Sequence, residues 1–172
     1  MEAVAFTSVL SRFPSSPLWG WHFLVPHEIA TLFTQGNDRR VVCTINEQLT
    51  LHCALMPNKD TWFIMLNQGV QKKLMTPLNS ELKISLIKDV SEYGMPMPDE
   101  LREVLDQDAE FDTYFHKLTP GKQRSLIYVV GKVKNSDSRI RKSLAIADHL
   151  TANRGKIESK LLYEALKEYN KM

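Results

Sequence analysis

The sequence predicts an α+β protein, in which a small β-barrel of five or six short strands precedes an all-helical domain. Short apolar runs that alternate like strands, with turn residues between them, fill residues 3–90. From Pro98 onward, apolar residues recur at helical spacing and no strand pattern is found. The segment Tyr93–Pro98 contains glycine and proline and separates the two patterns. The predicted domains are therefore residues 1–92 and residues 93–172.

The elements expected in the first domain are short. Aromatic and β-branched residues favour strands, and a proline suits the first turn of a helix, as at Pro26. In chain order we expect strands over 3–11 and Trp19–Val25, a helix over His27–Phe33, a turn at Gln35–Asp38, a hairpin over Arg39–Leu55, a turn at Met56–Asp60, a strand over Thr61–Leu66, one or two helical turns over Gly69–Met75, and a strand over Glu81–Val90.

The hairpin has a register that the sequence itself predicts. Placing both apolar sets on one face with a three-residue loop, Asn46–Gln48, pairs Ile45 with Leu49. Cys53 then lies diagonal to Cys43, whereas a five-residue loop would place the two cysteines directly opposite each other. We prefer the shorter loop and expect both cysteines to be free thiols in the core. Two cysteines do not form a disulfide framework.

The second domain is expected to hold five helices. Pro98 begins one, Asp108–Leu118 forms the next, and a tail helix spans Ile157–Tyr169. Between them lie two helices joined by a polar turn, the first capped by Thr119 and the second by Asn135 or Ser136. The apolar seam between these two helices is predicted to contain Leu126, Val130, Val133, Ile140 and Leu144.

This pair of helices carries an unusual charge. From Lys117 to Lys142 there are eight lysines and arginines against one acid, Asp137. Cations at the start of a helix oppose its dipole at a cost of roughly 0.3–1 kcal/mol each when exposed, and two basic helix starts close together favour an anion. The predicted anion-binding residues are Lys122, Arg124, Tyr128, Lys132, Arg139, Arg141 and Lys142. The alternative is a solvated helix face.

Several segments of the second half carry a family resemblance. Pro98-Asp-Glu-Leu101, Leu118-Thr-Pro-Gly-Lys-Gln-Arg124 and Ser138-Arg-Ile-Arg-Lys142 resemble the helical YdeI/OmpD-associated domain, also labelled bacteriocin-protection. The N-terminal half, with Val25-Pro26 and Val41-Val-Cys-Thr-Ile-Asn46, is similar to the β-barrel domain of unknown function that often precedes it. The resemblance implies a small split β-barrel followed by a helical domain in a bacterial cytoplasmic protein. The sequence departs from the family at Glu47 and Asn79-Ser80, where the family tends to have glycines.

Other classes of site lack their sequence signatures. The five histidines have no paired metal spacing, and there is no glycine-rich phosphate loop, no GxSxG motif and no evident Cys–His pair. We therefore predict no metal, cofactor or catalytic residues. The N-terminus has no charged leader pattern and no apolar run is long enough to span a bilayer, so we expect a cytoplasmic protein without a membrane partner.

Three functions from different classes follow from these observations. The first is a non-enzymatic binding or stress-protective protein whose basic helices hold an anionic small molecule or partner. The second is a nucleic-acid-binding protein, which a net charge of only +2 does not favour. The third is an enzyme of unrecognised type with its site between barrel and helices. The sequence makes no prediction of oligomeric state.

Overall fold

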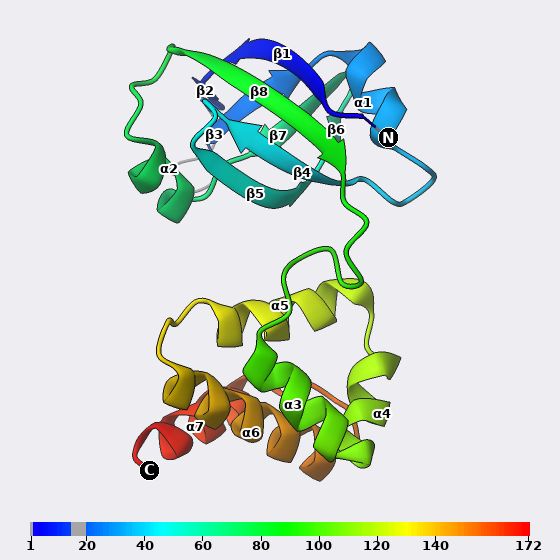
Figure 1. The fold of residues 1–172 in the computed structure, drawn as a ribbon, viewed down its shortest axis with the longest axis vertical. Helices are drawn as coiled ribbons and strands as arrows, with labels where there is room; N and C mark the ends of the chain where they lie inside the picture. The colour runs from blue at the N-terminus through cyan, green and yellow to red at the C-terminus, as the bar shows by residue number, and fades with distance from the viewer. Residues whose placement is uncertain (1, 15–19) are drawn as a thin grey trace. The chain divides into compact units, whose positions relative to one another are not determined.

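The computed structural model of the protein describes residues 2–14 and 20–172. The chain divides into two compact units, Met1–Val90 and Ser91–Met172. Strands and two short helices form the first unit, and helices form the second (Figure 1). The predicted α+β class, with strands before helices, is therefore confirmed. Trp19, expected at the start of a strand, lies outside the described residues.

The strands of the first unit form two four-stranded antiparallel sheets in the described residues, ordered β1-β8-β4-β5 and β2-β3-β7-β6. The elements are β1 (Val4–Val9), β2 (Ser11–Arg12), β3 (Trp21–Val25), α1 (His27–Phe33), β4 (Arg40–Ile45), β5 (Leu49–Ala54), β6 (Met56–Asn58), β7 (Thr61–Met65), α2 (Gln68–Leu74) and β8 (Glu81–Lys88). Most match the expected ranges closely, because alternation and turn residues are local signals.

At two of the described connections a strand bends directly from one sheet into the other. β1 continues into β2 through Leu10, and β5 continues into β6 through Leu55. Both leucines are fully buried, as expected where a bending strand turns the corner between two packed sheets. Neither sheet closes on itself within the described residues, so the expected barrel closure is not confirmed.

The predicted turn at Met56–Asp60 is wrong in its first half. Met56–Asn58 forms the edge strand β6, in which Pro57 lies opposite Trp62 of β7. An edge strand tolerates a proline because the missing N–H can face away from the ladder. The sequence pattern suggested a turn because proline and asparagine are frequent in both settings.

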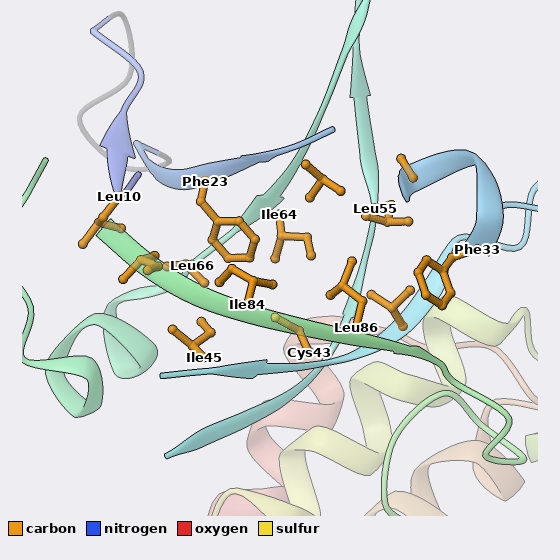
Figure 2. Close-up of a cluster of buried hydrophobic side chains, with 14 residues drawn as sticks. Leu10, Phe23, Phe33, Cys43, Ile45, Leu55, Ile64, Leu66, Ile84 and Leu86 are labelled. Atoms are coloured by element: carbon orange, nitrogen blue, oxygen red, sulfur yellow. The ribbon is translucent and has the colours of Figure 1, made fainter. Parts of the chain in front are cut away.

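The hairpin register is as predicted. Ile45 pairs with Leu49, Cys43 with Leu51, and Cys53 with Val41, so the two thiols lie on a diagonal, and both are free. A hydrogen bond with Cys53, together with burial, raises the pKa of the Cys43 thiol. Figure 2 shows the core of this unit, in which inward side chains of both sheets surround Phe23, Ile64 and Ile84.

The second unit contains α3 (Asp99–Gln107), α4 (Ala109–Lys117), α5 (Pro120–Gly131), α6 (Ser136–Ala152) and α7 (Ser159–Asn170). The caps predicted for the central pair are present. Thr119 Oγ1 accepts a hydrogen bond from the N–H of Lys122, and Asn135 Oδ1 accepts one from Ser138. Figure 1 shows the chain reversing direction between α5 and α6.

The predicted seam between α5 and α6 is only partly correct. Leu126 and Val130 are buried, but Val133 follows the end of α5. Ile140 and Leu144 are 41% and 40% exposed. The buried residues of α6 are instead Ser143, Ala145, Ile146, Ala147, His149 and Leu150. Ala147 and Leu150, which continue the helical spacing of Ile140 and Leu144, are buried, so the apolar stripe of α6 is buried only in its second half. The hydroxyl of Ser143 donates to the carbonyl of Arg139 within the helix.

Candidate functional site

The seven predicted site residues do not all lie together. Lys122 and Arg124 are in the first turns of α5, whereas Lys132 follows its last residue. The eight residues from Arg124 to Lys132 correspond to about 12 Å along a helix. Tyr128 and Lys132 line one pocket, and Arg124, one turn before Tyr128, does not.

That pocket has a volume of about 360 Å³ and lies within the helical unit. It is formed by the segment before α3, by the last turns of α5, and by the start of α6. Three of the predicted residues line it: Tyr128, Lys132 and Arg139. The remaining lining residues are Met95, Pro96, Met97, Pro98, Asp99, Ile127 and Gly131. The walls are therefore mostly apolar, with a phenol and two cationic side chains at their edge.

Arg139 is held by the end of the preceding helix. Its Nε donates to the carbonyl of Val133 at 2.7 Å, and its Nη2 donates to the carbonyl of Gly131 at 3.3 Å. The carboxyl end of a helix favours a cation. The dipole cost expected for Arg139 at the start of α6 is therefore offset, because its side chain reaches back to the end of α5.

Arg139 also has a carboxylate partner. Its Nη1 lies 3.7 Å from Oε2 of Glu100, and both side chains are largely buried, at 28% and 15% exposed. A hydrogen bond from its own backbone N–H lowers the pKa of the Glu100 carboxyl, and Ser136 and Arg139 lower it further. Much of the Arg139 charge is thus compensated, which leaves Lys132 as the principal uncompensated cation among the pocket's lining residues.

Lys142 lies outside the pocket lining but interacts with it electrostatically. Burial lowers the pKa of the Lys142 ammonium, and the charge of Lys132 lowers it further. Arg141 has a different environment, in which its Nη2 donates to Ser138 Oγ at 3.4 Å. The structure therefore associates Tyr128, Lys132, Arg139 and Lys142, and leaves Lys122, Arg124 and Arg141 apart from that group.

Sequence reasoning missed the apolar wall of the pocket. We interpreted Tyr93–Pro98 only as a boundary, yet Met95 and Met97 are half-buried against the helical core and line the pocket. Two methionines in a segment that otherwise reads as a turn were the available signal, because flexible thioether side chains often line adaptable binding surfaces. Asp99, the first residue of α3, adds a carboxylate to the wall.

The described residues give no indication of two other kinds of site. No group of three or more His, Cys, Asp or Glu side chains in residues 2–14 and 20–172 is arranged to hold a metal ion. In the same residues, no helix combines the length and apolar content that crossing a bilayer would need.

Comparison with known families agrees with the division into two units. Residues 6–86 match the family model described as a domain of unknown function (DUF1905). Residues 94–153, which include the whole pocket, match the model described as Bacteriocin-protection, YdeI or OmpD-Associated. No curated protein matches the chain. The chain therefore contains a segment that matches DUF1905, followed by a helical segment that matches the YdeI/OmpD-associated, bacteriocin-protection family.

Proposed function

We propose that the helical unit is a non-enzymatic binding module, in a protein with a binding or stress-protective role. Its pocket takes a small ligand that combines an apolar body with one anionic group, a carboxylate or a phosphate. The apolar body lies against Met95, Met97 and the ring of Tyr128, and the anionic group lies beside Lys132. A pocket of about 360 Å³ matches the lower part of the size range of small-molecule sites.

The observation that carries this proposal is the position of Lys132 in the lining of a mostly apolar pocket, beside Tyr128, and the charge of Lys142 lies near enough to interact with it. The two ammonium groups repel each other enough for Lys132 to lower the pKa of Lys142, in addition to the effect of burial. An anion near both relieves this repulsion, so its binding stabilises the folded state. Asp99 also lines the pocket, and its carboxylate repels an anionic group and so favours a position beside Lys132.

The description of the family is compatible with a binding role. It names protection against bacteriocins and association with OmpD. Protection and association each require a partner, and neither word names a reaction. The absence of catalytic signatures in the sequence points in the same direction.

A thermal-shift experiment tests the proposal. The melting temperature of the protein is measured with phosphate, sulfate and a series of aliphatic and aromatic carboxylates, at an ionic strength matched with chloride. We expect an anion-dependent rise that is largest for the ligands with an apolar body. Lys132→Gln should lose most of the rise. Lys122→Gln removes the same charge at the other end of α5 and should retain it.

Two outcomes would contradict this function. Equal responses of both variants would mean that the anions act on the overall charge and not on the pocket. Tighter, strongly salt-dependent binding of oligonucleotides would favour the nucleic-acid-binding alternative instead.

A further inference from the structure

A second concave surface lies between α3 and α6 in the helical unit. This groove has a volume of about 570 Å³ and is open to solvent along one side. Asp99, Glu100, Glu103 and Val104 of α3 line it, together with Ile140 and Leu144 of α6. The groove shares one lining residue, Asp99, with the pocket beside Lys132.

The floor of the groove is apolar and exposed. Ile140 and Leu144 are one helical turn apart on α6, and about two fifths of each side chain is accessible to solvent. Val104, which is half-buried, faces the same groove from α3. Single apolar residues on a surface need no explanation, but three of them lining one groove form a continuous apolar strip.

The rim of the groove is acidic. Its lining includes three carboxylates and no cationic side chain. The helix dipole accounts for Asp99 and Glu100, which are in the first turn of α3, and Arg139 compensates Glu100. Neither reason applies to Glu103, in the second turn, whose carboxylate accepts a hydrogen bond from the neutral side chain of Gln107. Asp137, three residues before Ile140, adds an exposed acid near the same stripe of α6.

We propose that this groove is a docking site for a cationic amphipathic peptide segment of another protein. The apolar stripe of the segment lies on Val104, Ile140 and Leu144, while its lysines and arginines approach Glu103 and Asp99. An apolar floor with an acidic rim is complementary to such a segment in both respects. A second copy of this chain is a poorer occupant, because its own basic helix α5 buries Leu126, Ile127 and Val130 inside its own unit.

Fluorescence anisotropy with three labelled model peptides tests the proposal. The first is a helical peptide of about 14 residues with leucines along one face and lysines on the other. The second has glutamates in place of the lysines, and the third has the composition of the first in scrambled order. We expect the first to bind, with weakening at high salt, the second not to bind, and the third to bind at least several-fold more weakly.

Paired variants locate the binding. Glu103→Gln should weaken the affinity for the first peptide roughly fivefold, and Leu144→Ala by a similar factor. Glu110→Gln on α4 removes an equal charge outside the groove, and Leu161→Ala shortens an exposed leucine of α7; both should bind as the wild type does. Melting temperatures of all four variants verify that they are folded.

Three results would overturn the proposal. The first is equal binding of the ordered and scrambled cationic peptides, which would indicate attraction by charge alone. The second is equal weakening by the variants inside and outside the groove. The third is a concentration-dependent dimer of the protein that Leu144→Ala dissociates, which would assign the groove to self-association.

Discussion

The guanidinium of Arg139, on α6, lies 3.7 Å from the carboxylate of Glu100, on α3, and donates to the carbonyls of Gly131, the last residue of α5, and of Val133 just after it. One side chain therefore links three helices. Arg139→Gln should lower the free energy of unfolding by about 1–3 kcal/mol, because it removes the cation beside a largely buried carboxylate and the donor to two carbonyls. Urea unfolding measures this change.

Arg141→Gln is the matched control for that experiment. Arg141 is also half-buried on α6, where its Nη2 donates to the hydroxyl of Ser138 at 3.4 Å. We expect a change of less than about 1 kcal/mol. Equal losses in the two variants would show that the contacts with Glu100 and α5 are not the source of the stabilisation.

The observed faces of α5 and α6 predict unequal losses of stability for substitution by asparagine. Val130→Asn places an amide at a fully buried position and should destabilise the protein by about 3 kcal/mol or more. Leu144→Asn changes a side chain that is 40% exposed and should cost less than about 1.5 kcal/mol. Thermal unfolding of the two variants is the measurement, and similar losses would restore the seam predicted from the sequence.

His149 makes the stability of the helical unit depend on pH. Its Nε2 accepts a hydrogen bond from the N–H of Glu158, the cap of α7, at 3.0 Å. Burial lowers the pKa of His149 below its ordinary value, against an opposing effect of Glu158. As the pH falls below about 6.5, the unfolded chain therefore binds a proton at His149 more readily than the folded chain does. The stabilisation is present above about pH 6.5 and is lost as the pH falls below it.

The expected slope for this single group is at most about 1.4 kcal/mol per pH unit. It is measured as the difference in urea stability between wild type and His149→Gln across the range from about pH 7.5 to pH 5.5. A constant difference between wild type and His149→Gln over that range would refute the linkage.

Gly155, in the turn between α6 and α7, should not tolerate a side chain. Its φ is +83°, and an added Cβ would lie 2.8 Å from Cδ1 of Tyr114. Gly155→Ala should cost at least about 1–2 kcal/mol from the backbone alone, and displacement of the Tyr114 ring adds to this. Gly121→Ala, in the first turn of α5, meets only the end of Arg124 at 4.0 Å, so its melting temperature should be unchanged or higher.

Replacing Glu47, in the hairpin loop, with glycine should stabilise the protein. The φ of Glu47 is +57°, in the left-handed region that glycine adopts without strain. Glu47→Gly should raise stability by about 0.5–1 kcal/mol. Gln48→Gly, one residue later and outside the left-handed region, should lower it. Chemical unfolding compares the two, and a loss in Glu47→Gly would show that the Glu47 side chain contributes to the folded state.

The sequence by itself determined the class of the fold, most of its secondary structure and the hairpin register. Each of these depends on local information: the period of the apolar residues, the caps at Thr119 and Asn135, and turn residues. The three-residue hairpin loop is an example, since the pairing of Ile45 with Leu49 that places both apolar sets on one face is the one observed. The resemblance to the YdeI/OmpD-associated family also followed from the order and spacing of local segments.

Only the tertiary structure decided which face of α6 is buried and which basic residues meet. Ile140 and Leu144 are more hydrophobic than Ser143 and Ala145, yet Ser143 and Ala145 are buried and the two larger residues are not. Long side chains also place charges far from their own helix. The guanidinium of Arg139, near the start of α6, reaches atoms of α3 and α5. Burial and charge pairing depend on distances between elements, which no local pattern encodes.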